Sequence, residues 1–427
     1  MIFSDIIKEH KTGVFPKIEF HQQKILSIIE KCRTPLMGSH LYVCRECESV
    51  LLLHNSCSNR NCPVCQGNKR KRWIDKQCNN LINAPYFHVV FTIPDVLNSL
   101  FLNHQNQCYN ALFHAAWDTL KQFFKNDKIL NGKGGMLSIL HTWGQNLSFH
   151  PHIHCLVPGA GISNTGEFKP IKGGHKFLFN VKSLAKVFRA KFAENISSEE
   201  KKGNLKISPI VRKMMFTKNW VVFSQRPFST PENVVRYIGM YSHRVAICEN
   251  RIIDNKNGIV SFFYKDYKDG GTKKTMQLTG EEFIRRFSLH ILPFRFTKIR
   301  YYGELNNRNI NNFTRIAQNS VGLYKENICV ETEQIPEKEI NTDNGVSQNN
   351  AIDFDLDYGL DDEHSVSKKT SIICPFCKKA FLHKLLAISY EDYNTGIIVV
   401  NSGSGEILFH CRAGPFCNSA QIIEIRF

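Results

Sequence analysis

Residues 150–157 have the sequence HPHIHCLV, which predicts a β-strand that carries histidines on one face. Side chains two positions apart share a face of a strand, so we expect His152 and His154 to point the same way while Ile153 turns into the core. Two imidazoles about 6 to 7 Å apart can hold one divalent ion between them. The competing interpretation is a pair of exposed strand histidines without a ligand.

Other predicted strands lie on both sides of this stretch. Residues 87–93 are β-rich and stop at Pro94, whereas residues 97–125 carry apolar side chains at helical spacing without Pro or Gly. Further strands are predicted at 136–143, 220–224 and 259–264. Strands that alternate with helices, with few glycine-rich turns between them, predict an α+β domain on a mainly antiparallel sheet.

Composition divides the 427 residues into four predicted segments. Residues 1–80 form a cysteine-rich unit, and residues 81–305 form the α+β domain. Residues 306–370 are rich in Asn, Asp and Glu with few aromatics, which predicts an acidic flexible linker. Residues 371–427 regain hydrophobic content and predict a small C-terminal module.

The charge of the chain is strongly uneven. The formal net charge is +17, yet residues 331–364 hold 11 acidic residues against Lys338 alone, so the rest of the chain carries +27. A surplus of this size attracts a polyanion, and phosphate neutralisation with release of counterions makes nucleic acid the expected partner. A basic protein without such a partner is the alternative.

The sequence predicts a cytoplasmic protein of a reducing compartment. Its first residues, MIFSDIIKEHKTGVF, lack the apolar core of a signal peptide, and no apolar run approaches the 18 or more residues that cross a bilayer. Clustered cysteines in such a compartment are expected to bind metal, and scattered cysteines to be small core residues. The scattered ones are Cys32, Cys78, Cys108, Cys155, Cys248 and Cys329.

Two cysteine pairs in residues 1–80 have the spacing of a tetrahedral zinc site. Cys44 and Cys47 are followed, after fourteen intervening residues, by Cys62 and Cys65. Two thiolates three positions apart on a tight turn reach one ion, and a second such turn completes the tetrahedron. A closed site with four ligands predicts a structural zinc that folds a domain.

Two other residues of the intervening loop, Cys57 and His54, are alternatives for one of the four ligands. The basic run Lys69, Arg70, Lys71 and Arg72 follows directly and is expected to contact DNA phosphates. Near the C-terminus, Cys374, Cys377, Cys411 and Cys417 form either a second zinc ribbon with an irregular second turn or a set of buried thiols.

A helix is predicted from Thr230-Pro231-Glu232, which combines a capping hydroxyl, Pro at the first helical position and an acid in the first turn. It contains Tyr237 and Tyr241, four positions apart and therefore neighbours on one face. Tyrosines at this spacing usually pack in a core. Beside a histidine-bound metal, however, they match a nucleophile that attacks a DNA phosphate, because the metal polarises the phosphate oxygens.

The ordered combination of these motifs resembles a known family. The strand PYFHVVFTIP, the HPHIH string, the YIGMYSHR helix and the zinc segment SCSNRNCPVC are similar to the two-tyrosine HUH transposases of rolling-circle insertion sequences, over residues 30–305. The resemblance implies a ferredoxin-like HUH endonuclease domain with the metal on a central strand, His152 and His154 as the HUH pair, and Tyr237 and Tyr241 as nucleophiles. It leaves the third metal ligand open among His150, His141 and Gln145.

The resemblance also implies partners and cofactors. We expect a structural Zn²⁺, an exchangeable catalytic Mg²⁺ or Mn²⁺, and single-stranded DNA of the element ends and target as substrate, with Arg244 on a flanking phosphate. Host helicase and replication machinery are candidate partners in the bacterial nucleoid, and no membrane is involved. The alternatives are a plasmid replication initiator or relaxase with the same chemistry, and a non-catalytic zinc regulator. A zinc deaminase is disfavoured because no His-x-Glu precedes a Pro-Cys-x2-Cys in this sequence.

Overall fold

The structure is a computed structural model. It describes residues 2–47, 49–171, 179–224, 231–320, 372–379, 381–388, 397–402 and 405–410. Two compact units are present, one formed by Met1–Cys65 with Asp355–Phe427 and the other by Gln66–Phe354. No helix in these described ranges is long and apolar enough to cross a membrane.

The first unit combines the two ends of the chain. Helices α1 (Ile2–Val14) and α2 (Phe20–Glu30) pack on each other, and the hairpin of β1 (Ser39–Cys44) and β2 (Val50–His54) follows. Strand β15 (Phe381–Ile388) pairs antiparallel with β1, so that the sheet order is β14-β15-β1-β2. The remaining strands of this part are β14 (Ile372–Ile373) and the paired β16 (Ile397–Ser402) and β17 (Gly405–His410).

The second unit is built on a five-stranded sheet. Its order is β13-β5-β6-β3-β9, and every neighbouring pair is antiparallel. The histidine stretch lies on β6, the central strand, which confirms the predicted α+β fold with an antiparallel sheet. The strands are β3 (Tyr86–Thr92), β5 (Gly135–Trp143), β6 (Phe149–Pro158), β9 (Val221–Ser224) and β13 (Ile299–Gly303).

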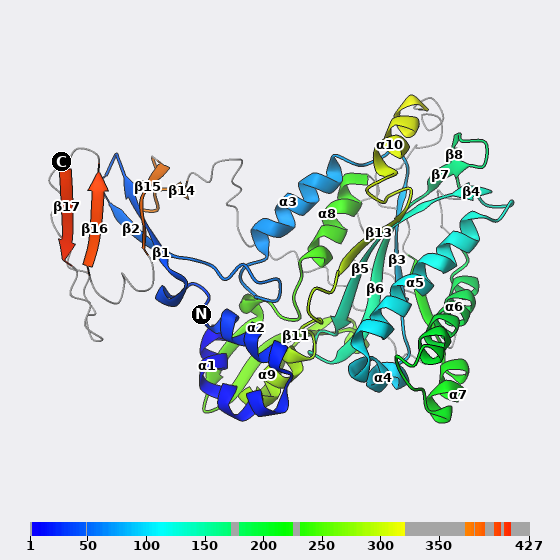
Figure 1. The fold of residues 1–427 in the computed structure, drawn as a ribbon, viewed down its shortest axis with the longest axis horizontal. Helices are drawn as coiled ribbons and strands as arrows, with labels where there is room; N and C mark the ends of the chain where they lie inside the picture. The colour runs from blue at the N-terminus through cyan, green and yellow to red at the C-terminus, as the bar shows by residue number, and fades with distance from the viewer. Residues whose placement is uncertain are drawn as a thin grey trace. The chain divides into compact units, whose positions relative to one another are not determined.

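The two faces of this sheet carry different side chains because residues alternate along each strand. Val89, Phe91 and Ile153 belong to the core that also contains buried residues of α5 (Gln105–Phe124) and α6 (Val181–Lys201). Tyr86, Leu137 and Leu156 belong to a second core with residues of α8 (Pro231–Ser242) and α10 (Ile310–Asn319). Helix α3 (Gly67–Cys78) lies beside α8 in Figure 1.

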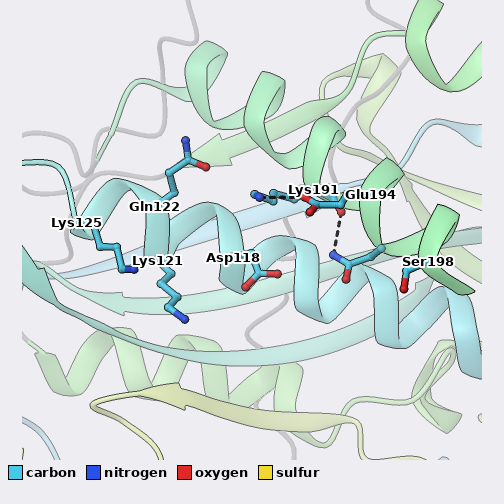
Figure 2. Close-up of a pocket in the computed structure, with 8 residues that line it drawn as sticks. Asp118, Lys121, Gln122, Lys125, Lys191, Glu194 and Ser198 are labelled. Carbon is cyan, nitrogen blue, oxygen red and sulfur yellow. Dashed lines mark hydrogen bonds and ion pairs between the residues drawn. The ribbon is translucent and has the colours of Figure 1, made fainter.

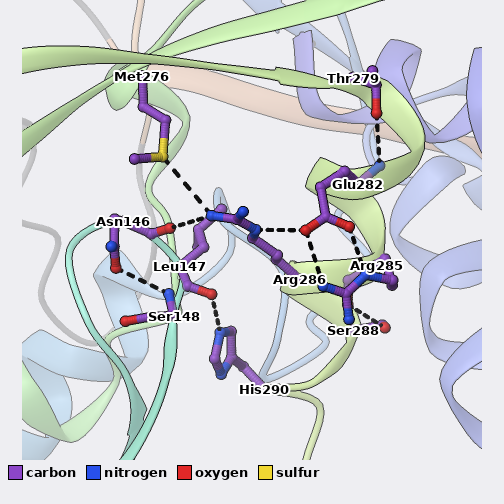
Figure 3. A network of polar contacts seen from close by, with 10 residues as sticks. All are labelled: Asn146, Leu147, Ser148, Met276, Thr279, Glu282, Arg285, Arg286, Ser288 and His290. Carbon is purple, nitrogen blue, oxygen red and sulfur yellow. Dashed lines mark hydrogen bonds and ion pairs between the residues drawn. The ribbon is translucent and has the colours of Figure 1, made fainter.

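A network of polar contacts holds the turn between β5 and β6 (Figure 3). Arg286 of α9 (Gly280–Ser288) donates to Glu282 at 2.7 Å and to the backbone oxygen of Asn146 at 3.4 Å. His290 contacts the backbone oxygen of Leu147 at 3.3 Å and the hydroxyl of Thr142 at 3.2 Å. These contacts fix the turn that leads directly into the histidine stretch.

Smaller elements complete the second unit. A sheet of β10 (Ile252–Lys256), β11 (Ile259–Asp266) and β12 (Thr272–Thr279) precedes α9, and β11 begins where the sequence predicted a strand. The others are α4 (Asn98–Asn103), α7 (Pro209–Thr217), and the sheet of β4 (Gly132–Lys133), β7 (Ala160–Ser163) and β8 (Phe168–Pro170).

Three sequence predictions differ from the structure. The helix predicted over 97–125 is broken at His104, whose backbone leaves the helical region at φ −136° and ψ 52°. Residues 310–319 of the predicted linker form α10, because Phe313 and Ala317 are buried in the second core. Residues 66–80 of the predicted N-terminal domain belong to the second unit, since α3 packs on α8. The rest of the predicted linker, from 321 to 370, lies outside the described residues.

Candidate metal centre and tyrosine pair

Three histidines converge on the face of the sheet that α8 covers. His141 of β5 lies opposite His152 of β6 in the strand register, and His154 follows two positions along β6. Side-chain nitrogens of His141, His152 and His154 lie within 4.8 Å of one another, and we call these three residues the histidine cluster. The Nε2 atoms of His152 and His154 are 3.1 Å apart. All three side chains are buried, so the predicted pair faces the protein interior.

Hydrogen bonds to backbone oxygens set the orientation of two of these rings. His152 donates from Nδ1 to the backbone oxygen of His150 at 2.7 Å, which leaves Nε2 with a free lone pair toward His154. His141 donates from Nε2 to the backbone oxygen of Tyr241 at 2.8 Å, which leaves Nδ1 as its acceptor atom. Such contacts fix the tautomer of a metal-binding histidine.

Burial keeps the cluster uncharged. It lowers the pKa of His152 to about 3, with a smaller contribution from His150. Burial, followed by the positive charge of Lys298, lowers the pKa of His141 well below its usual range, and burial likewise lowers the pKa of His154. At neutral pH the three imidazoles are therefore neutral, which is the form that coordinates a metal ion.

The two tyrosines of α8 lie directly against this cluster. The hydroxyl of Tyr241 donates to that of Tyr237 at 2.9 Å, as the spacing of four along one helix face predicts. The ring of Tyr241 stacks on His154 with centroids 4.3 Å apart. Tyr237 is 7% and Tyr241 2% exposed, so the pair is closed off from solvent in this structure.

A fourth histidine, His88 of β3, joins the group and was not singled out from the sequence. Its Nε2 lies 2.8 Å from Nδ1 of His154, and its ring is edge-on to Tyr237 at 5.3 Å. Alternation along β3 was the available indication, because Val89 and Phe91 face the opposite core and His88 must therefore face α8.

The structure separates the candidates for a third ligand. His141 belongs to the histidine cluster, whereas His150 contributes its backbone oxygen to His152. Gln145 is buried in the turn after β5, and its backbone oxygen accepts a hydrogen bond from Arg251. Of the three, His141 is the residue that the geometry groups with His152 and His154.

Positive charges surround the tyrosine helix. The basic run lies on α3, where Lys71 and Arg72 are exposed. Burial lowers the pKa of His243 to about 4, and the charges of Lys298, Lys69 and Arg70 contribute. The basic run therefore lies near the end of α8.

Close packing brings α3 onto α8. A Cβ atom on Gly239 would lie 2.3 Å from Cγ1 of Ile74, so only glycine allows this approach. Helix α8 ends at Ser242, and Arg244 consequently lies beyond the helix that the sequence predicted to contain it. Its backbone oxygen accepts a hydrogen bond from Lys298 at 2.7 Å.

The predicted zinc quartet is wrong as a group, because its two pairs belong to different clusters. Cys62 and Cys65 meet Cys32 and Cys57, and these four residues are the N-terminal cysteine cluster. Sulfur separations are 3.4 Å for Cys32 to Cys65, 3.7 Å for Cys62 to Cys32 and 3.8 Å for Cys57 to Cys65. The alternative ligand Cys57 is thus present, and Cys32, expected to be a simple core residue, is a fourth member.

Cys44 and Cys47 instead lie with Cys374 and Cys377, and we call these four the two-segment cysteine cluster. The pairing of β15 with β1 brings the two segments together, which spacing along the chain cannot reveal. His54 belongs to neither cluster, since its Nδ1 contacts the hydroxyl of Ser39 at 2.7 Å. Cys411 and Cys417, and with them the predicted ribbon, lie outside the described residues, as does Cys329.

A polar pocket between α5 and α6 is separate from the histidine cluster (Figure 2). It contains the ion pair of Lys191 with Glu194 at 3.0 Å, and Asp118 and Lys121 also line it. These helices cover the face of the sheet opposite the histidines. The pocket therefore has no part in the chemistry of the cluster.

Comparisons with known proteins agree with the motifs. The family described as "Putative transposase" matches residues 135–312, and the family described as "Transposase zinc-binding domain" matches residues 2–93. The "Putative transposase y4qJ" of Sinorhizobium fredii is 39% identical over 300 residues, covering 67% of this chain and 75% of the relative. The "Transposase for insertion sequence element IS801" of Pseudomonas savastanoi pv. phaseolicola is 27% identical over 291 residues, covering 65% of this chain and 68% of the relative. No solved structure matches the chain.

The match to the "Putative transposase" family spans β5, β6 and α8, which carry the histidine cluster and the tyrosine pair. The match to the "Transposase zinc-binding domain" family spans the N-terminal cysteine cluster. Sequence motifs and family matches thus agree over residues 2–93 and 135–312. The chain belongs to the two-tyrosine transposase family of insertion sequences, the family of the IS91 and IS801 elements, and residues 2–93 contain its zinc-binding domain.

Proposed function

We propose that this transposase nicks and rejoins single-stranded DNA through a 5′-phosphotyrosine intermediate. Tyr237 and Tyr241 are the nucleophiles, and His141, His152 and His154 hold a divalent metal. The observation that carries the proposal is the stacking of Tyr241 on His154, with centroids 4.3 Å apart. The contact supports the proposal because it joins residues of two different elements, Tyr241 of α8 and His154 of β6, in the arrangement that a nucleophile beside a metal ligand would need.

The donor set supports Mg²⁺ or Mn²⁺ in the histidine cluster. Neighbouring ligands of an octahedral ion at about 2.1 Å are about 3 Å apart, close to the 3.1 Å between the Nε2 atoms of His152 and His154. Two lone pairs at that distance repel unless a proton or cation lies between them. A bound ion would polarise the phosphate oxygens and stabilise the charge of the transition state.

The cleavage step replaces the phosphate ester of the 3′ oxygen with a phosphate ester of tyrosine. The tyrosine oxygen forms a bond to phosphorus, the bond from phosphorus to the 3′ oxygen breaks, and the 3′ oxygen leaves with a proton as a hydroxyl. The tyrosine gives up its own proton, although the pKa of an unperturbed tyrosine is near 10. Attack by a 3′-hydroxyl on the phosphotyrosine reverses the step, so rejoining needs no ATP.

Two nucleophiles suit strand transfer. One cleavage occurs at the first element end and another at the far end or target, while the first 5′ end is still covalently bound. A single tyrosine would be occupied at that moment, whereas Tyr237 and Tyr241 have their hydroxyls 2.9 Å apart. Either oxygen is then close to the same histidine cluster.

The charges around α8 support a DNA strand as substrate. Lys298 and Arg244 both lower the pKa of His141 through their positive charges, so both lie near the cluster. The basic run of α3 adds phosphate contacts beside the same helix. Because both tyrosines are more than nine-tenths buried, DNA binding must displace the groups that cover them.

The Zn²⁺ of the zinc-binding domain has a different role. We propose that Cys32, Cys57, Cys62 and Cys65 hold it, because sulfurs of a tetrahedral zinc site with bonds of about 2.3 Å are about 3.8 Å apart. The measured separations of 3.4 to 3.8 Å are close to that value. Four thiolates leave no open position for a substrate.

The proposal is tested with single-stranded oligonucleotides from the element ends. Incubation with Mg²⁺ or Mn²⁺ should give a covalent protein–DNA adduct on a denaturing gel, with a free 3′-hydroxyl on the released strand. Peptide mapping should place the adduct on Tyr237 or Tyr241. An adduct on another residue, or cleavage without any adduct, would contradict the proposed chemistry.

A further inference from the structure

The two-segment cysteine cluster has no part in the chemistry proposed above. Cys44-x2-Cys47 and Cys374-x2-Cys377 are two turns of the same spacing, and Cys47 and Cys374 are 327 positions apart. The described parts of the chain bring them together in the first unit, where β15 pairs with β1 over six residues of each strand. Cys44 ends β1, and its register partner on β15 is Leu382.

The sulfur geometry fits a metal and excludes a disulfide. Cys44 and Cys377 have their sulfurs 3.6 Å apart, and so do Cys47 and Cys374. A disulfide requires about 2.05 Å, whereas the sulfurs around a tetrahedral zinc ion are about 3.8 Å apart. All four sulfurs lie within 4.8 Å of one another.

The cluster lies at the edge of a small core. Cys44 and Cys374 are fully buried and pack with Leu382, whereas Cys377 is half-buried and Cys47 is exposed. Each pair lies on a tight turn: the backbone N–H of Cys44 donates to the oxygen of Ser49, and that of Lys378 donates to the oxygen of Cys374. Backbone N–H groups of Glu46 and Cys47 donate to the sulfur of Cys44 on the same turn.

We propose that the two-segment cysteine cluster is a second structural zinc site, which joins residues 372–388 to the β1–β2 hairpin. Two such pairs supply four thiolates, the set that encloses Zn²⁺ without an open position. The β1–β2 hairpin and the short strands β14 and β15 offer only a small core of their own, so the ion supplies much of their folding energy. The zinc-binding unit thus depends on both ends of the chain.

Cobalt(II) substitution of the full-length protein tests this proposal. Thiolate ligands give cobalt(II) a charge-transfer absorption that imidazole and oxygen ligands lack, so the histidine cluster does not contribute. The wild-type chain should hold two thiolate-bound ions. Cys374→Ser with Cys377→Ser should hold one, and Cys57→Ser with Cys65→Ser should also hold one. Two thiolate-bound ions in the variant with Cys374→Ser and Cys377→Ser would overturn the proposal.

Two control variants define the ligand set. Cys248→Ser changes a thiol outside both clusters, and it should retain two ions. Cys411→Ser with Cys417→Ser should also retain two ions, and loss of one ion in this variant would assign the tail cysteines to a separate ribbon instead.

The variant Cys374→His guards against misfolding because it keeps four ligands in the two-segment cysteine cluster. It should retain both ions with the thiolate absorption of seven sulfurs, and an absorption equal to that of the wild type would contradict the assignment.

Discussion

The Nε2 atom of His88 lies 2.8 Å from the Nδ1 atom of His154, and both rings are fully buried between the sheet and α8. If His154 uses Nε2 for the metal, its Nδ1–H donates to His88, which makes His88 the residue that orients the ligand. Contacts of this kind typically change metal affinity by about 10 to 100-fold when they are lost.

We therefore expect His88→Ala to weaken Mn²⁺ binding by about 10 to 100-fold, because His154 loses the partner that fixes its ring. Calorimetric titration with Mn²⁺ measures the effect. His88→Gln, which keeps a polar acceptor, should recover part of the affinity. Equal Mn²⁺ affinity in wild type and His88→Ala would show that His88 only packs against Tyr237.

The tyrosine pair gives the second prediction. Single Tyr237→Phe and Tyr241→Phe variants should nick oligonucleotides to different extents and each impair complete transposition, whereas the double variant should form no adduct. The change keeps the rings and removes one buried hydrogen bond, so the melting temperature should fall only by the equivalent of about 1 kcal/mol.

Tyr109→Phe is the matched control for these variants. Tyr109 is fully buried in the opposite core, and its hydroxyl has no hydrogen-bond partner among the described residues. Adduct yield should be the same as in the wild type. A DNA adduct in the double variant would place the nucleophile elsewhere and reduce Tyr237 and Tyr241 to core packing.

Metal removal should separate the two kinds of site. Mild EDTA should stop cleavage while the zinc content and the fold persist, since imidazoles and oxygen donors release their ion more readily than four thiolates do. Cleavage should return when Mn²⁺ is added.

The histidine variants test the ligands of this metal. His152→Ala with His154→Ala should abolish cleavage, and His141→Ala should raise the Mn²⁺ concentration that cleavage requires. A wild-type rate in the double variant would refute the histidine assignment.

The basic run should contribute phosphate contacts. Replacing Lys69, Arg70, Lys71 and Arg72 with glutamine should weaken binding to all sequences and flatten the salt dependence, by about 0.7 in the log–log slope for each contact to single-stranded DNA. The control replaces four exposed lysines of α6, α7 and the residue after α7, namely Lys182, Lys186, Lys213 and Lys218. A similar change of slope in both variants would show a general charge effect.

Acid should destabilise the second unit partly through His290. Burial lowers the pKa of His290 to about 4 in the folded chain, compared with 6.5 in the unfolded chain. The neutral ring stabilises the fold above pH 6.5, and this contribution, up to about 3 kcal/mol, is lost as the pH falls from 6.5 to 4. His290→Gln should make the free energy of unfolding fall less steeply over that range.

Urea unfolding at several pH values measures this slope. His114→Gln is the control, because His114 is exposed on α5. Its slope should equal that of the wild type. A His290→Gln variant with the wild-type slope would assign the acid sensitivity to the other buried histidines.

The sequence alone determined the features that depend on a few neighbouring residues. Alternation along a strand placed His152 and His154 on one face, and a spacing of four placed Tyr237 and Tyr241 side by side, as the structure has them. The short Cys-x2-Cys spacing likewise identified the pairs that share a turn. These relationships follow from backbone geometry, which repeats every two residues in a strand and every 3.6 in a helix.

Only the tertiary structure decided which of these local features meet. Strand register places His141 opposite His152, and packing of α8 on the sheet brings the tyrosines to the histidines. The pairing of β15 with β1 gives Cys44 and Cys47 partners more than 300 positions away, so the nearer pair of Cys62 and Cys65 joins Cys32 and Cys57 instead. Spacing along the chain cannot select between such partners, because the contacts depend on the burial of whole strands and helices and not on the distance between residues in sequence.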